Sequence, residues 1–184
     1  SVIKPEINSL EKIMKEGEES LEKIKNYLGE LNSKTKELSE ELKTNKEKEK
    51  ELQDERNFLE QIAEMSPVCI TKLNAEGEII YANDRAEDVL GLSKSEIKGR
   101  AYNDVKWNIT DFDGNKFPDE KLPFNQVKEK GEPVYDIKHA IEWPNGEWKL
   151  LSINASPIYD EEGKFDGMVA SIENVTEKVK KERK

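Results

Sequence analysis

Only a few side chains in this sequence have the types and spacing that chemistry needs. The 184 residues include one histidine, His139, and one cysteine, Cys69, so neither has a second group of its kind to share a metal site or a nucleophilic pair. Asp111 and Asp113-Gly114 resemble the start of a calcium loop, but Leu122 stands where the bidentate glutamate should be. The sequence also has no glycine-rich phosphate loop and no kinase ATP-site motif. We therefore expect neither a metal site nor an enzymatic activity in this chain.

The charge balance and the apolar content limit the class of protein. There are 40 acidic and 30 basic side chains, a net charge of −10, which argues against a nucleic-acid partner. The longest stretch without a charged residue is the ten residues from Leu150 to Tyr159, whereas a membrane span needs about 20 apolar residues. With 38% charged and 34% hydrophobic residues, the chain cannot bury all of its length in one core. We therefore expect a folded domain joined to a segment that is solvated or paired along its length.

The cysteine content predicts the cellular compartment, and the first residue bears on whether the sequence is a piece of a longer protein. A single cysteine cannot form an internal disulfide, which is typical of a reducing compartment, so we expect a cytoplasmic location. The sequence begins at Ser1, without an initiator methionine or a secretory signal. We expect it to be a piece of a longer protein, and the rest of that protein could carry a membrane anchor.

Residues 1–66 repeat every seven positions. Apolar residues occupy 13 of the 18 positions spaced alternately by three and four from Ile3 to Ala63. This pattern predicts a helix of roughly 90 Å with an apolar stripe that must pair with another helix, which is a coiled coil. We expect a homodimer. Its pairing seam is predicted at Leu21, Ile24, Leu28, Leu31, Leu38, Leu42, Leu52 and Leu59.

The geometry of this pairing stays open at the sequence level. Flanking charges do not distinguish parallel from antiparallel helices, and extra apolar residues beside the seam would also suit a four-helix bundle. A break near residues 29–33 would instead give a folded-back hairpin. The seam is weakest from Asn45 to Arg56, which either loosens the register or is only a poor patch in a tether.

The remaining residues carry the patterns of a mixed domain. Alternating apolar residues bounded by turn signals predict strands at Val68 to Leu73, Glu78 to Ala82, Pro133 to Glu142, Glu147 to Ile158 and Phe165 to Glu173. Capping and stop signals predict helices from Asn83 to Leu90, from Ser93 onward, and from Asp119 to Lys130, with residues 101–118 irregular. Two strands, then helices, then three strands predict an α+β fold, in which helices cover one face of a five-stranded antiparallel sheet.

Several stretches of this domain resemble a PAS domain, the sensory module of signal-transduction proteins such as histidine kinases. They are Gly77 to Asn83 running into Ala86, Leu90 to Ser93, Glu96 to Arg100, Trp107, Asp113-Gly114, Pro118, Leu122-Pro123, Gly131 to Val134, Asn145-Gly146, Ser152 to Ile158, Gly163 and Gly167. The resemblance covers roughly residues 58–177. With the coiled coil predicted at 1–66 from the heptad pattern, it implies a PAS domain at 67–176 and the start of an outgoing signalling helix at 177–184.

The end of the last predicted strand departs from the family pattern. PAS domains often end there in Asp-Ile-Thr, which is thought to tie the strand to the outgoing helix, whereas this chain has Asn174-Val175-Thr176. Asparagine keeps its hydrogen-bonding capacity but loses the charge for a salt bridge. The resemblance implies a signal junction at Asn174, Thr176 and Glu177, with the hinge role weakened by this substitution.

PAS folds commonly enclose a cavity between the sheet and the helices, so the resemblance implies a small-molecule ligand as a hypothesis. The residues expected near such a cavity fall on helices or on inward strand positions, and core packing is the competing interpretation for each of them. They are Asn83, Tyr102, Trp107, Phe117, Phe124, Val127, Ile137, Ile153 and Ala170. Asn83 and Tyr102 are the expected polar contacts, although Asn83 is also the predicted cap of a helix.

Two cofactors found in PAS relatives do not suit this sequence. Haem needs an axial ligand, and His139 falls on a strand, where a structural histidine is the plainer interpretation, whereas the relatives usually ligate from the preceding helix. A cysteinyl flavin needs a cysteine on a helix, and Cys69 falls in the first strand, where it suits a small core residue.

These patterns lead to one functional hypothesis and one rival. In the first, a PAS module of a histidine kinase or a chemotaxis-type transducer couples ligand or partner binding to a rearrangement of the coiled coil. In the rival, a ligand-free PAS domain serves dimerisation and protein interaction on a structural tether. They differ in whether the core contains a ligand-sized void and whether filling it changes the helices.

Overall fold

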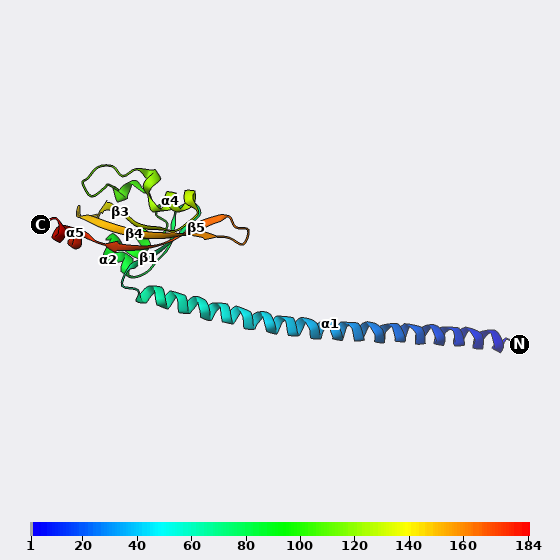
Figure 1. The fold of residues 1–184 in the computed structure, drawn as a ribbon. Helices are drawn as coiled ribbons and strands as arrows, with labels where there is room; N and C mark the ends of the chain where they lie inside the picture. The colour runs from blue at the N-terminus through cyan, green and yellow to red at the C-terminus, as the bar shows by residue number, and fades with distance from the viewer. Residues whose placement is uncertain (1) are drawn as a thin grey trace. The chain divides into compact units, whose positions relative to one another are not determined.

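The first element of the computed structural model, which describes residues 2–184, is one helix, α1 (Ile3–Met65) (Figure 1). The helix runs without interruption through residues 29–33, so the hairpin alternative is wrong. No residue of α1 is fully buried, and the predicted seam residue Leu28 is 53% exposed. The apolar stripe of α1 therefore has no partner within the described chain.

The chain divides into two compact units after Phe58. The last turns of α1 belong to the second unit, residues 59–184, which we call the C-terminal unit. Its sequence resemblance also began near Phe58.

The C-terminal unit contains one five-stranded antiparallel sheet, which confirms the α+β prediction (Figure 1). The strands are β1 (Cys69–Asn74), β2 (Ile79–Ala82), β3 (Val134–Glu142), β4 (Trp148–Tyr159) and β5 (Phe165–Asn174). Their spatial order is β2-β1-β5-β4-β3, so the first and last strands pair at the centre of the sheet. This pairing requires the chain between β2 and β3 to cross from one edge of the sheet to the other, and the helices lie in that segment.

The helical segments are short and pack against the sheet. They are α2 (Arg85–Leu90), α3 (Lys94–Ile97), the 3-10 turns η1 (Val105–Trp107) and η2 (Asp119–Lys121), α4 (Pro123–Lys130) and, after the sheet, α5 (Thr176–Glu182). Helix α2 contacts β1, and α4 contacts β3, β4 and β5. The predicted first turn after Ser93 is confirmed, since the Glu96 carboxylate accepts a hydrogen bond of 2.9 Å from the Ser93 N–H.

The helix predicted from Asp119 to Lys130 is two elements. The turn η2 ends at Lys121, Leu122 has an extended backbone (φ −64°, ψ 144°), and α4 starts at Pro123. A residue before proline is driven out of the helical region by the proline ring, while proline itself fits the first position of a helix. The sequence Leu122-Pro123 therefore interrupts one helix and starts another.

One prediction about a helix cap is wrong. The N-cap of α2 is Asp84, not Asn83, and Asp84 makes no capping hydrogen bond through its side chain. The Asn83 side chain is completely buried and bonds elsewhere, as described below.

Candidate ligand-binding site

A cavity of about 70 Å³ lies in the C-terminal unit between the inner face of the sheet and the helical segments. All five strands contribute lining side chains: β1, β3, β4 and β5 from positions within the strand, and β2 through Ile79 at its start. From the helical side come Leu90 at the end of α2 and Phe124 of α4. All of the lining side chains are uncharged.

Five of the nine residues predicted near a cavity line this one. They are Tyr102, Trp107, Phe124, Ile153 and Ala170. Trp107 and Phe124 lie on helical segments, Ile153 and Ala170 on inward strand positions, and Tyr102 in the turn between α3 and η1.

The other four predicted residues lie outside the cavity lining. Val127 is fully buried in the core, on α4. Ile137 is half-buried beside the irregular register between Val134 and Ile137 in β3. Phe117 packs at a tilt against His139, with ring centroids 5.5 Å apart. The Asn83 side chain points toward the end of α1, where it donates a hydrogen bond to the Ala63 carbonyl.

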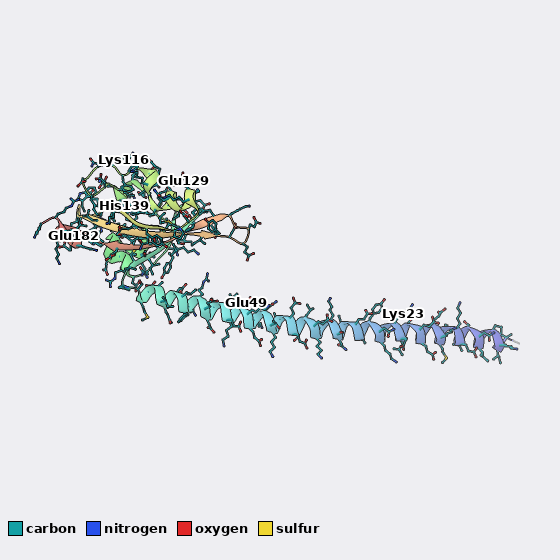
Figure 2. All side chains as sticks on the ribbon, viewed as in Figure 1. Lys23, Glu49, Lys116, Glu129, His139 and Glu182 are labelled. Carbon is teal, nitrogen blue, oxygen red and sulfur yellow. The ribbon has the colours of Figure 1, made fainter. Side chains whose placement is uncertain are left out.

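His139 lines the cavity, which the sequence reasoning missed by treating it only as a haem ligand or a structural strand residue. It is 5% exposed, and Figure 2 labels it on the domain. The signal was present in the sequence: His139 and Ile141 share the strand parity of Ile137, which had been expected to face inward. Thr71, Leu151 and Met168 were missed as well, although each lies on an inward strand position.

The electrostatic state of His139 follows from its burial. Loss of solvent lowers the pKa of the imidazole from 6.5 to about 4, so the ring is neutral at pH 7. Its Nδ1 atom is buried and has no hydrogen-bond partner among the described residues. Such an unpaired buried polar atom is uncommon in folded proteins.

The polar atoms of two neighbouring aromatic residues are already paired. The Tyr102 hydroxyl donates to Asn125 Oδ1 at 3.0 Å, and its ring stacks on Phe124 with centroids 4.5 Å apart. The Trp107 Nε1–H donates to the Ala101 carbonyl at 2.9 Å. These contacts fix both aromatic rings as walls of the cavity.

The cavity is too small for the cofactors that the sequence analysis considered. A cavity that holds benzene is roughly 150 Å³, and haem and flavin are far larger than benzene. The volume of about 70 Å³ therefore accommodates neither. Cys69 is fully buried outside the cavity lining, and burial raises the pKa of its thiol to about 12, so it is a poorly reactive core residue.

A second cluster joins the end of α1 to the sheet, and we call it the α1 anchor: Ala63, Glu64, Tyr81, Asn83 and Lys94. Asn83 Nδ2 donates to the Ala63 carbonyl at 2.7 Å and to the Val68 carbonyl at 3.0 Å. Asn83 Oδ1 accepts from the Ile70 N–H at 2.9 Å. One buried amide therefore holds both the last turn of α1 and the first strand.

Glu64 provides the charged half of the α1 anchor. Its carboxylate accepts from the Tyr81 hydroxyl at 2.9 Å, from the Asp84 N–H at 2.8 Å and from the Lys94 ammonium at 3.2 Å. Lys94 also pairs with the Asp84 carboxylate. Burial and the hydrogen bond to Glu64 raise the pKa of Tyr81 to about 12, so this hydroxyl remains a donor at neutral pH.

The predicted signal junction lies where β5 meets α5. The Thr176 hydroxyl donates to Asn174 Oδ1 at 2.6 Å and accepts from the Leu150 N–H at 2.9 Å. The Thr176 N–H also donates to Asn174 Oδ1, at 3.1 Å. Asn174 acts here as an acceptor, a role that aspartate and asparagine share, while Glu177 is exposed and pairs with Lys180.

Residues 2–184 contain neither a membrane-spanning helix nor a cluster of metal ligands. No helix there has the length and apolar character to cross a membrane. Nor do these residues bring together three or more histidine, cysteine, aspartate or glutamate side chains as a metal site.

Comparisons with known proteins agree with this architecture. A family model described as the PAS fold matches residues 63–180. No curated protein matches the chain. Among solved structures, a PAS domain from Colwellia psychrerythraea is similar with a TM-score of 0.52 and 16% identity, over 68% of this chain and 98% of that one.

Two further solved structures share the fold. An RNA-binding light-oxygen-voltage receptor has a TM-score of 0.53 and 20% identity, over 67% of this chain and 34% of that receptor. A PAS domain from a two-component sensor histidine kinase has a TM-score of 0.50 and 14% identity, over 66% of this chain and 97% of that one. At these identities the likeness concerns the fold alone.

Proposed function

Because this chain belongs to the PAS family, we propose that it is the sensory module of a larger signal-transduction protein, such as a histidine kinase or a chemotaxis-type transducer. In this proposal the chain itself performs no catalysis. A small molecule occupies the cavity, and the change it causes in the domain alters the arrangement of two α1 helices in a homodimer.

The observation that carries the proposal is the α1 anchor. A helix that only tethers a domain needs no buried contacts with it, whereas Glu64 bonds the last turn of α1 to β2 and α3, and Asn83 links it to β1. The Asn83 side chain connects β1 to α1, because its Oδ1 accepts from the Ile70 N–H of β1 while its Nδ2 donates to the Ala63 carbonyl of α1. A shift of the sheet would therefore change the hydrogen bonds at the end of the helix.

The homodimer is inferred from the exposed seam of α1. Leucine and isoleucine side chains recur along one stripe of the helix, and Leu21, Ile24 and Leu28 are each more than half exposed. Such a stripe is stabilised only by burial against another apolar surface. A second copy of the same helix offers a stripe of matching length and spacing.

Placing a charge in the seam is expected to dissociate the dimer. Leu28→Glu would bury two unpaired carboxylates in each dimer, and we expect the dimer dissociation constant to rise by roughly 100-fold or more. Analytical ultracentrifugation across micromolar concentrations measures this. The matched control is Asn26→Glu, which adds the same charge on the opposite side of the helix and should leave association unchanged. Equal dimerisation of both variants would show that the seam is assigned wrongly.

Coupling between the domain and the helices can be tested through Glu64. Single cysteines at Leu28 and Leu31 report how the two helices face each other through their disulfide cross-linking rates, and buried Cys69 does not compete. Glu64→Gln removes the charge that holds Lys94 and is expected to change the ratio of the two rates at least twofold.

The control for this experiment is Glu47→Gln, which removes the same charge from an exposed position of α1 away from both the seam and the α1 anchor. It should leave the ratio of cross-linking rates as in the parent chain. If Glu64→Gln behaves in the same way, the domain does not influence the helices through the anchor, and α1 serves only as a tether.

A further inference from the structure

We propose that His139 is the recognition residue of the cavity, and that the ligand is a small uncharged molecule with one N–H or O–H group that hydrogen-bonds the imidazole. The rest of the ligand is apolar. The inference rests on the proposed function, since it names the ligand class of the same cavity.

The first argument is the unpaired nitrogen of His139. The side chain is 95% buried, it lines the cavity, and Nδ1 has no hydrogen-bond partner among the described residues. A buried polar atom without a partner destabilises a folded protein. A molecule that supplies the missing hydrogen bond therefore stabilises the folded state and gains binding free energy. Because His139 lines the cavity, a ligand there lies next to this imidazole.

The second argument is that the other aromatic walls have no free polar atom to offer. The Tyr102 hydroxyl is used by Asn125, and the Trp107 indole N–H is used by the Ala101 carbonyl. A ligand with several polar groups would leave most of them unpaired in an apolar surrounding. One polar group directed at His139 satisfies the imidazole, and the Thr71 hydroxyl is a further polar group of the cavity lining.

The third argument is charge. None of the residues that line the cavity is acidic or basic apart from His139, whose imidazole is neutral at pH 7 because of its burial. Tyr102 is the other titratable lining residue, and its hydroxyl is a hydrogen-bond donor. An ionic ligand would lose its hydration without gaining a counter-charge, so the site selects neutral molecules.

The fourth argument is size. The cavity measures about 70 Å³, whereas an engineered apolar cavity that binds benzene is roughly 150 Å³. The ligand therefore has only a few non-hydrogen atoms, as in a short alcohol or a five-membered azole. Such a molecule would lie against Met168 and Ala170 of β5, at the centre of the sheet next to β1.

Pyrazole and furan form a matched pair of probes. Both are flat five-membered rings, but pyrazole offers an N–H donor and a nitrogen acceptor, so it pairs with either tautomer of a neutral histidine. Furan has no N–H to donate, and its ring oxygen is only a weak acceptor. We expect pyrazole to bind roughly tenfold more tightly than furan, the effect of one buried hydrogen bond.

The readout is NMR on the complete chain. His139 is the only histidine, so its two side-chain nitrogen resonances report on this site alone. Met168 lines the cavity, so its methyl group is a second reporter, whereas Met14 lies on α1 and serves as an internal control. Pyrazole should shift the His139 nitrogens and the Met168 methyl, and leave Met14 unchanged.

His139→Leu should remove the preference for pyrazole over furan while keeping an apolar cavity. The comparison of two probes on the parent chain does not depend on the folding of that variant. Equal affinities for pyrazole and furan, or shifts that avoid His139, would overturn its role in recognition. If neither probe binds at tens of millimolar, the ligand class is wrong. A Glu64-dependent change of cross-linking would then still support the proposed sensory function.

Discussion

Replacing Asn83 with leucine is expected to lower the unfolding free energy of the PAS domain by roughly 3–5 kcal/mol, because each buried group left unpaired costs about 1–3 kcal/mol. Leucine has a similar shape but makes no hydrogen bonds. It would leave the Val68 carbonyl and the Ile70 N–H without their Asn83 partner, and the Ala63 carbonyl would keep only its backbone hydrogen bond from the Ser66 N–H. Chemical denaturation of the parent chain and the variant measures the difference.

The same substitution is expected to loosen the end of α1 more than the rest of the domain. Asn83 is the residue that bonds the Ala63 carbonyl to the sheet, so amide hydrogen exchange over residues 59–65 should speed up most. The control is Asn154→Leu, which removes one exposed hydrogen bond to the Asp136 N–H and should change stability by less than about 1 kcal/mol. Similar losses in the two variants would show that Asn83 is not an anchor.

The second large effect is a loss of stability in mild acid that depends on His139. The imidazole has a pKa of about 4 in the folded chain and 6.5 when exposed, so between these values the unfolded state binds more protons. The contribution of the neutral imidazole to the free energy of unfolding is fully present above pH 6.5 and is lost as the pH falls toward 4. The loss over this window is about 3 kcal/mol at about 1.4 kcal/mol per pKa unit.

The pH effect is isolated by comparison with His139→Leu. Asp84 and Glu96 have pKa values below their ordinary range, so these carboxylates lose their stabilising contribution at lower pH, and they do so in both chains. The difference in unfolding free energy between the chains, measured from pH 7 to pH 4, should therefore follow His139 alone. Identical pH dependence of the two chains would mean that the imidazole is hydrated or paired in the folded state.

The architecture was predictable because it depends on local patterns. The heptad spacing in residues 1–66 predicted a continuous helix, and α1 spans Ile3–Met65. Alternating apolar residues between turn signals predicted all five strands of the sheet. Of the two helices predicted with a wrong start, one begins at Arg85 instead of after an Asn83 cap, and the other contains Leu122-Pro123, where the local effect of proline outweighed the longer helical pattern.

The candidate site was predictable only in part. Tyr102, Trp107 and Phe124 were expected at the cavity and line it, because large inward aromatic side chains have few other places in a domain of this size. His139 was missed because a histidine on a strand has no fixed role until its surroundings are known. Asn83 was expected at the cavity and as a helix cap, and it has neither role.

The sequence by itself determined the family, the order of the strands along the chain and the continuous helix of α1, because periodicity and turn chemistry act between neighbouring residues. Only the tertiary structure decided that Asn83 bonds Ala63, 20 residues away, and that the His139 nitrogen is left without a partner beside an uncharged cavity. The physical reason is that hydrogen-bond pairing of buried groups depends on which segments meet in space, and distant segments meet only when the sheet closes.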